Sequence, residues 1–568
     1  MYIATIPNRG SPPAILLREG YREGGQVKNR TLANLSQWPA QKVDLLRRLL
    51  RDEPLARVDE LFEAVASPHH GHVQAVRTAM QRLGFDTLLA ARPSRERNLV
   101  VAMVAARILE PDSKLATTRW WHTTTLPALL EVADADEDDL YGALDWLLER
   151  QERIEQKLAA RHLTEGGLVL YDLTSSYFEG TTCPLAAFGH DRDGKQGKLQ
   201  VNYGVLTDAR GCPVAVSVYK GNTGDPKTLL PQVVRVRERF GIERLVLVGD
   251  RGMITDTQIT ALRAQAGVDW ITALKTGAIR ALVETGQLQL GLFDERNLFE
   301  LRSPDFPGER LVACRNPELA KLRAHTRQAL LAATSQELET VRRLVNRRRL
   351  QGRAAIGVRV GQVINKYKVA KHIQLAIHDD RLDFHLKEAQ IAAEAALDGL
   401  YVIRTSVPPE RLDAPETVRS YKQLSVVERA FRSLKTLDLK VRPIYHRLEE
   451  RVRAHIFLCL LAYYVEWHMR EAWRPLLFAD EDQAAKRTRD PVAPAQRSAG
   501  ALRKVHAKVL DDGTPVHSFQ TLLKRLSGIV RNVCRRRGAG PTEPTTEIVT
   551  TPSPEQQRAY ELLNTIRV

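Results

Sequence analysis

Three acidic residues stand at positions from which their carboxylates could hold metal ions together. Asp172 and Asp250 each follow a short apolar run, and such runs predict β-strands. Glu428 lies in a segment whose apolar residues recur at three- and four-residue spacing, which predicts a helix. Two strand-end aspartates and one helical glutamate can bind a pair of Mg²⁺ ions roughly 4 Å apart. Such a pair activates an attacking oxygen and stabilises the leaving oxygen in phosphodiester chemistry.

The three acids are far apart along the chain, so only the fold could bring them together. A strand end suits a metal ligand because the sheet fixes the direction of the side chain and the following loop admits the substrate. Other acids have simpler interpretations. Asp208 and Asp225 are typical of a turn and a helix cap. Asp191 and Asp193 lie in a loop that no strand fixes, so we do not expect them to be ligands.

The helix predicted around Glu428 places several useful side chains on one face. Tyr421, Glu428 and Lys435 are spaced by seven residues, which brings each to within about 20° of the one before. Arg432 falls on the same face, so a tyrosine, an acid and two cations lie together. A surface row of ion pairs, such as Glu428 with Arg432, is the alternative interpretation. An adjoining apolar stripe should pack on the sheet; it comprises Val427, Ala430, Phe431 and Leu434.

The charge balance indicates a polyanionic partner. Lys and Arg number 84 against 68 Asp and Glu in 568 residues, a formal net charge of +16. This excess predicts affinity for nucleic acid, although a basic enzyme with no nucleic-acid role is the alternative. No glycine-rich phosphate loop supports an ATPase.

Four basic residues outside the Glu428 helix are further candidates for contact with DNA phosphates. Arg251 directly follows the second aspartate, and Lys195 lies in a basic hairpin. Arg347 and Arg348 belong to the arginine-rich end of a long helix that starts at Pro317. Six arginines there, with no nearby acid, favour phosphate contact, whereas a solvated helix face is the alternative.

The cysteines and the apolar runs bound the location of the protein. The five cysteines are scattered, with none of the close spacings of zinc ligands, so we expect ordinary thiols in a reducing compartment. The N-terminus lacks the basic start and long apolar run of a signal peptide. The longest apolar stretch, residues 456–465, is too short to span a bilayer. We therefore expect a soluble, cytoplasmic, nucleoid-associated protein with no membrane partner.

The order of the patterns predicts the fold class. Strands are expected at residues 168–173, 199–206 and 214–219, followed by helix, strand, helix and strand up to residue 274. Three consecutive strands followed by alternating helices and strands imply an α/β fold, a mixed sheet with helices on both faces.

The composition shifts along the chain predict six parts. They are a β-hairpin unit (1–35), a helical DNA-binding or accessory domain (36–162), the first part of the sheet core (163–274), an α+β insertion with a long basic helix and strands (275–397), the second part of the core (398–475), and a basic C-terminal region with a flexible tail (476–568). Within the insertion, residues 358–363 and 373–377 are expected to be strands.

Together these features resemble the DDE transposases of bacterial insertion sequences, in particular the IS-four-type superfamily. That family has strand-end aspartates, a β-rich insertion before the glutamate, and a helical motif of Tyr, two residues, Arg, three residues, Glu, six residues, Lys. Tyr421, Glu428 and Lys435 match this motif, whereas Leu424 stands where Arg is usual. Candidates to replace the missing cation are Arg419, Lys422 and Arg429.

The resemblance implies an RNase H-like core that cuts and joins DNA with two Mg²⁺ ions, for which Mn²⁺ can substitute. It implies that Asp172, Asp250 and Glu428 are the catalytic metal ligands and that Tyr421 and Lys435 contact phosphates near the cleaved strand. The partners implied are the terminal inverted repeats of the element, target DNA, and a second copy in a homodimer or larger assembly. A catalytically decayed DNA-binding protein and a related nuclease that never joins strands are the alternatives.

Overall fold

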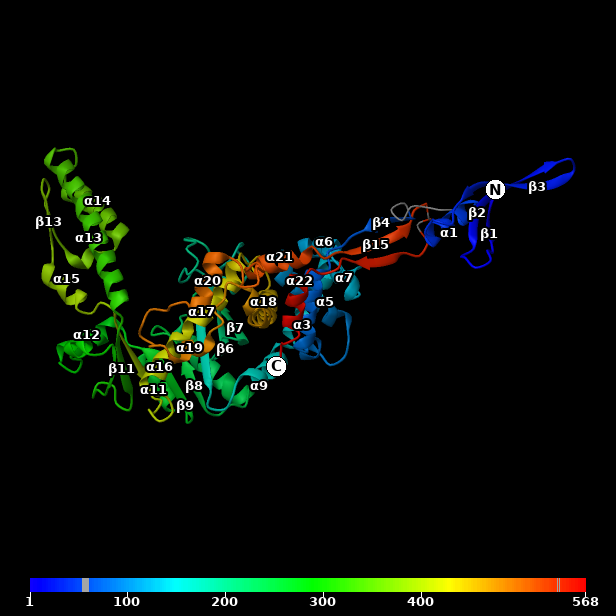
Figure 1. The fold of residues 1–568 in the computed structure, drawn as a ribbon. Coiled ribbons are helices and arrows are strands. Elements are labelled where there is room, and N and C mark those ends of the chain that lie inside the picture. The colour runs from blue at the N-terminus through cyan, green and yellow to red at the C-terminus, as the bar shows by residue number, and fades with distance from the viewer. Residues whose placement is uncertain (54–60, 539, 541) are drawn as a thin grey trace. The chain divides into compact units, whose positions relative to one another are not determined.

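The computed structural model describes residues 1–53, 61–538, 540 and 542–568 (Figure 1). The chain forms two compact units. The N-terminal unit comprises residues 1–68 together with residues 530–551, and the main unit comprises residues 69–529 together with residues 552–568.

The N-terminal unit contains two three-stranded antiparallel sheets among its described residues. The first has the order β1-β2-β3 and consists of β1 (Tyr2–Ile6), β2 (Ala14–Glu23) and β3 (Gln26–Asn34). Helix α1 (Ala40–Leu49) follows it along the chain. The second sheet has the order β16-β15-β4 and joins both ends of the chain through β4 (Phe62–Ala66), β15 (Arg531–Arg536) and β16 (Thr546–Val549). The hairpin predicted from the first residues is confirmed, whereas β3 was missed because all of its residues are exposed and its pattern is mostly polar.

The main unit begins with a helical layer, as the apolar spacing predicts. Its helices are α3 (Gly71–Arg82), α4 (Phe85–Leu89), α5 (Arg95–Leu109), α6 (Lys114–Trp120), η1 (Trp121–Thr123), α7 (Leu126–Leu129), α8 (Glu137–Leu148) and α9 (Gln151–His162). Helix α5 is central, because residues Leu99 to Ile108 are buried on all sides against α8 and against α18 (Glu449–Ala472). Helix α18 is likewise buried over most of its length, with a wholly apolar middle from Ile456 to Val465, which confirms the prediction of a buried helix there.

An eight-stranded mixed sheet forms the middle of the main unit, with the order β10-β11-β14-β9-β8-β5-β6-β7. Its strands are β5 (Leu168–Tyr177), β6 (Gln200–Asp208), β7 (Pro213–Lys220), β8 (Leu245–Val248), β9 (Val268–Ala273), β10 (Leu298–Leu301), β11 (Arg310–Arg315) and β14 (Leu400–Thr405). The first three strands form an antiparallel meander, and β8 and β9 then run parallel to β5. This α/β architecture, with a mixed sheet of RNase H-like order at its centre, confirms the predicted fold class.

Helices cover the sheet and connect its strands. Along the chain they are α10 (Pro226–Val234), η2 (Arg235–Arg239), α11 (Asp256–Arg263), α12 (Thr276–Glu284), η3 (Leu290–Asp294), α16 (Ala414–Lys422), α17 (Leu424–Arg432) and η5 (Ser433–Leu437). The C-terminal region adds η6 (Arg474–Leu476), α19 (Gln483–Thr488), α20 (Ala499–Ala507), α21 (Phe519–Ser527) and α22 (Pro554–Leu563). The sequence predicts a flexible tail, whereas α22 packs against α3 and α18 and buries Ala559 and Leu563. None of the described helices has both the length and the apolar character needed to cross a membrane.

The segment between β9 and β14 is partly built into the sheet. Strands β10 and β11 extend it beyond β14, and the remaining elements form a separate core: α13 (Pro317–Asn346), α14 (Arg353–Tyr367), η4 (Ala370–His372), β12 (Ile373–Ile377), β13 (Leu382–Leu386) and α15 (Glu388–Ala395). Figure 1 shows α13 and α14 side by side with β13 next to them. The strand predicted at residues 358–363 is wrong. Ile356, Val360 and Val363 are buried at helical spacing while Val358 is exposed, so the segment belongs to α14.

The packing of α17 on the sheet gives a first prediction. Phe431 is 7% exposed, and its ring meets the ring of Tyr203 edge-on at 6.1 Å between centroids. Phe431→Ala should therefore lower the free energy of unfolding by about 3 kcal/mol, the usual cost of removing a buried aromatic ring. Chemical denaturation followed by far-UV circular dichroism measures this. Phe188→Ala is the control, because Phe188 is 69% exposed and its loss should cost less than about 0.5 kcal/mol. A comparable small loss at Phe431 would mean that α17 does not pack as described.

Candidate active site

The sequence predicts Asp172 at the end of a strand, but Asp172 lies within β5. The strand continues to Tyr177 because Thr174, Ser175 and Ser176 go on pairing with β6. The neighbour on the other side, β8, pairs only as far as Leu170 with Val248. Asp172 therefore stands just beyond the point where β8 leaves the sheet.

Asp250 comes two residues after β8, and the parallel register places it beside Asp172. Leu170 is level with Val248, so the residues two positions later, Asp172 and Asp250, are level as well. Neighbouring strands lie about 4.8 Å apart, so the carboxylates are close. One oxygen of each is fixed by the backbone. The Leu173 N–H donates to Oδ1 of Asp172 at 2.8 Å, and the Met253 N–H donates to Oδ1 of Asp250 at 2.7 Å.

The environment of Asp172 disfavours its negative charge. The pKa of Asp172 is raised to about 7, chiefly by burial and also by the nearby carboxylates of Asp250 and Asp225, against the opposing effects of the Leu173 N–H and of Arg192. A divalent cation between the two aspartates would offset this desolvation and repulsion and favour the ionised form. The oxygen donors of these side chains are also the ligands that hard divalent ions prefer. The residues present therefore fit a divalent metal site.

Glu428 lies on the exposed side of α17, whose apolar side packs on β5. Tyr421 senses the charges of all three acids. Burial raises the pKa of Tyr421 to about 12, and the charges of Asp250, Glu428 and Asp172 all raise it, which places the phenol within electrostatic reach of the whole triad. The predicted apolar stripe is confirmed, since Val427, Ala430, Phe431 and Leu434 are all buried.

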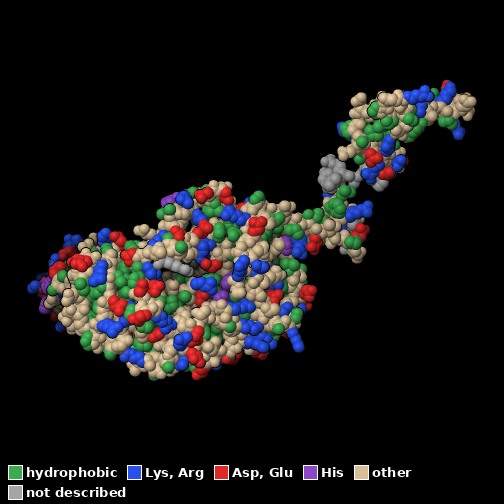
Figure 2. All heavy atoms as spheres, turned by 60° about the horizontal axis from the view of Figure 1, so that its bottom comes forward, with side chains coloured by type: hydrophobic (Ala, Val, Ile, Leu, Met, Phe, Trp, Pro, Cys, Tyr) green, Lys and Arg blue, Asp and Glu red, His purple; other side chains and the backbone are tan. Residues whose placement is uncertain are grey.

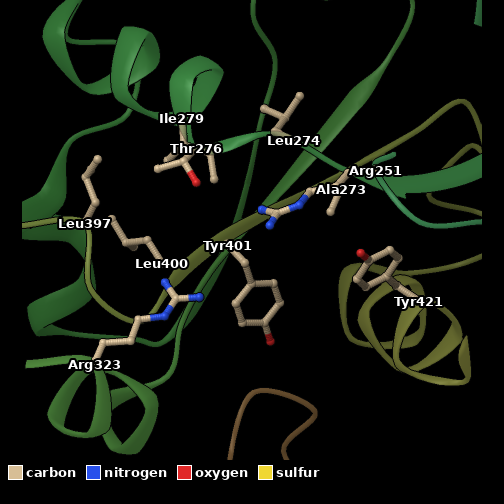
Figure 3. A pocket seen from close by; sticks show the side chains of 10 residues that line it. All are labelled: Arg251, Ala273, Leu274, Thr276, Ile279, Arg323, Leu397, Leu400, Tyr401 and Tyr421. Atoms are coloured by element: carbon tan, nitrogen blue, oxygen red, sulfur yellow. The ribbon is translucent and has the colours of Figure 1, made fainter. Parts of the chain in front are cut away.

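A small cavity of about 140 Å³ adjoins the triad. Figure 3 shows the guanidinium groups of Arg251 and Arg323 directed into it, with Tyr421 across the cavity from Arg323. Arg251 follows Asp250 directly, and its charge opposes the rise in the pKa of Tyr421. Cationic and phenolic donors therefore line the space beside the carboxylates.

The predicted common face does not extend to Lys435. Helix α16 ends at Lys422 before α17 begins at Leu424, and Lys435 lies in the wider turn η5, so the seven-residue spacing no longer returns to one direction. Lys435 is buried, and its Nζ lies 2.9 Å from Oδ1 of Asp193, which also pairs with Arg442.

Two acids that the sequence assigned to a helix cap and to a loop have other partners. Asp225 precedes α10 but makes no side-chain cap; both of its carboxylate oxygens accept from Nη2 of Arg192, at 2.5 and 2.6 Å. Asp193 forms the buried pair with Lys435 and Arg442. The sequence around Asp225 and Asp193 does not reveal these ion pairs, because the partner side chains lie far away along the chain. Asp208, in contrast, holds its turn as predicted by accepting from the Arg210 and Cys212 N–H groups.

The other predicted DNA contacts lie on the surface. Arg432 is exposed on α17, Arg347 and Arg348 are exposed after α13, and Lys195 is exposed with its Nζ 5.8 Å from the centre of the Tyr177 ring. The expectation of no acid near the six arginines around the end of α13 is wrong for one of them, Arg342, which pairs with Glu339 at 2.5 Å. Figure 2 shows Lys and Arg side chains spread over the visible face with Asp and Glu between them, so surface charge alone does not mark a DNA path there.

The cations proposed to replace the motif arginine differ in their surroundings. Arg419 and Lys422 donate to the backbone carbonyls of Arg489 and Pro491, which ties them to the C-terminal region. Arg429 is exposed on α17.

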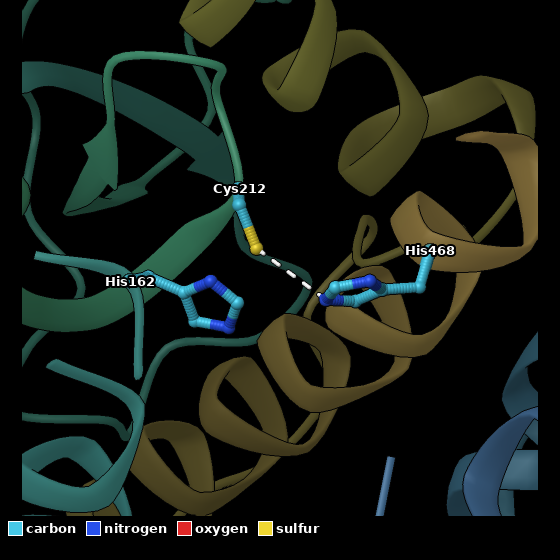
Figure 4. Close-up of side chains that lie close together, drawn as sticks. All are labelled: His162, Cys212 and His468. Carbon is cyan, nitrogen blue, oxygen red and sulfur yellow. Dashed lines mark hydrogen bonds between the residues drawn. The ribbon is translucent and has the colours of Figure 1, made fainter. Parts of the chain in front are cut away.

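One further cluster was not expected from the sequence. Cys212, in the turn before β7, meets His162 of α9 and His468 of α18, with their ligand atoms within 4.8 Å of one another (Figure 4). Among the described residues, no other group of three His, Cys, Asp or Glu side chains has its ligand atoms this close together. The carboxylate oxygens of the three acids are therefore not all within 4.8 Å of one another. Thiol and imidazole donors suit zinc. Arg210 Nη2, however, lies 3.5 Å from Nδ1 of His162, and Arg161 acts on both histidines, so positive charge opposes a cation here.

Comparison with known proteins identifies the catalytic region. The model of the transposase DDE domain matches residues 166–465, more than half of the chain. The chain belongs to the DDE transposase family. The model of the IS1634 family transposase N-terminal domain matches residues 3–61. The predicted resemblance to insertion-sequence transposases is therefore confirmed. This transposase is therefore a DNA-cutting and DNA-joining enzyme of a family that generally uses divalent metal ions.

Two solved structures of transposases are similar to parts of the chain. The piggyBac transposase in a synaptic complex with hairpin DNA is 9% identical with a TM-score of 0.33, over 80% of this chain and 77% of that one. The Mos1 transposase in a paired-end complex with the left transposon end is 12% identical with a TM-score of 0.14, over 32% of this chain and 60% of that one. Among curated proteins there was no match.

The buried pair around Asp193 gives a second prediction. Its carboxylate is 2% exposed and balances Lys435 and Arg442, so Asp193→Asn leaves two cations without a counter-charge. The free energy of unfolding should fall by about 3 kcal/mol, measured by thermal or chemical denaturation. Asp191→Asn is the control, because its Oδ1 only accepts the Asp193 N–H, which an amide oxygen can also do. Equal effects of the two substitutions would contradict the assigned ion pair.

Proposed function

We propose that this transposase binds the terminal inverted repeats of its insertion sequence, cuts the DNA there and joins the freed ends to target DNA. Asp172, Asp250 and Glu428 are the proposed ligands of two Mg²⁺ ions. The observation that carries the proposal is the register of β5 with β8, which sets Asp172 level with Asp250 two residues beyond β8, in a chain of the DDE family. The raised pKa of Asp172 supports it, because a cation would relieve the crowded charge. Mn²⁺ is expected to substitute, since carboxylate and water ligands suit it as well.

The protein's own groups bind and orient the DNA strand. Tyr421 stays protonated at neutral pH, since its pKa is raised to about 12, and its hydroxyl can donate to a phosphate oxygen. Arg251 beside the triad and Arg432 on α17 supply cations for neighbouring phosphates. When bound, the metal ions would activate water and later a 3′-hydroxyl, and would stabilise the leaving oxygen. No covalent link between enzyme and DNA is needed.

More distant contacts and the assembly follow from the reaction. Lys195, Arg347 and Arg348 are proposed to contact phosphates farther from the cut, because they are exposed. Lys435, held by Asp193, is proposed to orient the end of the catalytic helix and to reach a phosphate. Two element ends must be joined in concert, so a homodimer or larger assembly on DNA is expected.

The third prediction concerns the glutamate. Glu428→Gln should abolish Mg²⁺- or Mn²⁺-dependent cutting of DNA that carries the element's own flanking repeats, a loss of at least about 10³-fold, because the amide cannot balance a metal ion's charge. Gel analysis of the cut and joined products measures this. Glu416→Gln, an exposed acid on the preceding helix α16, is the control and should cut normally.

The products also separate the alternatives. Cutting that survives Glu428→Gln would mean that Glu428 is not the third ligand. Cutting without any joined product would favour a nuclease. Binding of the repeats by a wild-type protein that cuts nothing would favour a decayed DNA-binding protein.

The fourth prediction concerns metal binding without DNA. Mg²⁺ should raise the melting temperature of the wild type, and EDTA should reverse the rise. Asp172→Asn should itself raise the metal-free melting temperature, because it removes a carboxylate that burial and Asp250 disfavour, and it should abolish the Mg²⁺ shift. Asp208→Asn is the control. It weakens a turn, so it should lower the melting temperature and keep the Mg²⁺ shift. A full Mg²⁺ shift in Asp172→Asn would contradict the assignment.

A further inference from the structure

A second, larger cavity lies in the main unit between the helical layer and the chain that follows η5. Its volume is about 610 Å³. Residues from α5, α6 and α8 line one side, and residues 440–448 and the start of α18 line the other. None of these residues belongs to the triad or to the cavity beside Tyr421.

The lining of this cavity is strongly basic. Asp112 is the one acid in it, and its carboxylate accepts the Ser113 N–H at 2.7 Å. Two cations have acidic partners outside the lining: Arg442 pairs with Asp193, and Arg451 lies 4.0 Å from Asp145. The cations of the lining are Arg107, Lys114, Lys440, Arg442, Arg447 and Arg451.

Lys114 shows that this charge is not balanced within the protein. It is 4% exposed, and its ammonium forms no hydrogen bond or ion pair with any described residue. Burial, together with the charge of Arg107, lowers the pKa of Lys114 to about 7. Burying an unpaired ammonium is unfavourable, so lysines this buried are normally paired.

A further donor in the lining, Nε of Arg451, also has no hydrogen-bond partner among the described residues. Buried donors are usually satisfied by an acceptor. A cavity with unpaired buried donors, excess positive charge and room for several atoms is therefore suited to an anion with several acceptor oxygens.

We propose that this cavity binds a backbone phosphate of a DNA strand that leads into the active site. A phosphate diester offers the negative charge and the acceptor oxygens that arginine and lysine bind well. The inference rests on the proposed function, which supplies the DNA, and adds a binding site that lies apart from the cleavage site.

The position of the cavity relative to the triad supports a DNA strand as the source. Ile444, within residues 440–448, lies beside Phe178 directly after β5: its N–H donates to the Tyr177 carbonyl at 3.2 Å, and its carbonyl accepts the Glu179 N–H at 2.9 Å. Asp172 lies six residues before Phe178, about 20 Å away at roughly 3.3 Å per residue. That distance corresponds to about six nucleotides of B-form DNA at 3.4 Å each. A strand cut at the triad can therefore reach the cavity.

The first experiment removes the unpaired charge without DNA. Lys114→Met keeps the length of the side chain but not the ammonium, so the melting temperature should rise in anion-free buffer. The wild type should be stabilised by added inorganic phosphate, and the variant should lose that shift. Lys504→Met is the matched control. Lys504 is also buried but is paired with Glu481 and with the Leu477 carbonyl, so its loss should lower the melting temperature and keep the phosphate shift. A lower melting temperature for Lys114→Met would overturn the anion site.

The second experiment identifies the source of the phosphate. Binding of duplex DNA carrying the element's end is measured at several salt concentrations, and the slope of log K against log salt should fall by about one in Lys114→Met. An unchanged slope and affinity with a lost phosphate shift would overturn the DNA assignment in favour of a small free anion. If the wild type shows the full slope but Glu428→Gln does not affect cutting, the proposed triad fails while the phosphate site stands.

Discussion

The parallel pairing of β5 with β8 is the constraint on which the active site depends. It sets Asp172 and Asp250 level with each other, although 250 − 172 = 78 residues separate them in sequence. A shift of this register by one residue would turn one of the two side chains to the other face of the sheet. The apolar residues of β8 fix the register, because Leu245 to Val248 are buried on both faces. The core of the sheet thus determines where the charged groups lie.

Burial and charge act against each other throughout the main unit. Near the triad the crowding of Asp172, Asp250 and Asp225 is balanced in part by Arg192. Around Asp193 the charges meet within the protein, because one carboxylate pairs with two cations. In the cavity near Lys114 the excess is positive. A metal ion would offset the negative charge near the triad, and a phosphodiester would offset the positive charge in the cavity.

The sequence predicted the parts of the fold whose patterns are local. The apolar runs before Asp172 and Asp250 located the two strands, and the stripe beside Glu428 located the helix that packs on them. The resemblance to a known family then united the three acids, which no spacing argument could do.

What the sequence missed depended on contacts with distant segments. The polar end of β5 continues as a strand because β6 pairs with it, and the apolar run 358–363 is helical because only one of its sides meets α13 and the adjoining hairpin. The wide turn η5 redirected Lys435 without any proline or glycine to mark it. In the sequence Lys114 is an ordinary lysine at the start of a helix, and only the fold shows that Arg107 and residues 440–448 lie around it.

The sheet that combines β4 with β15 and β16 imposes an order on biosynthesis. Its strand at residues 62–66 is made first, whereas its partners at residues 531–549 are made only after the whole catalytic core. Chains elongate at about 5–20 residues per second, so β4 waits roughly half a minute or more for β15. A prematurely terminated chain can never complete this unit. The N-terminal region thereby acquires its second sheet only in a protein that already contains every residue of the catalytic core.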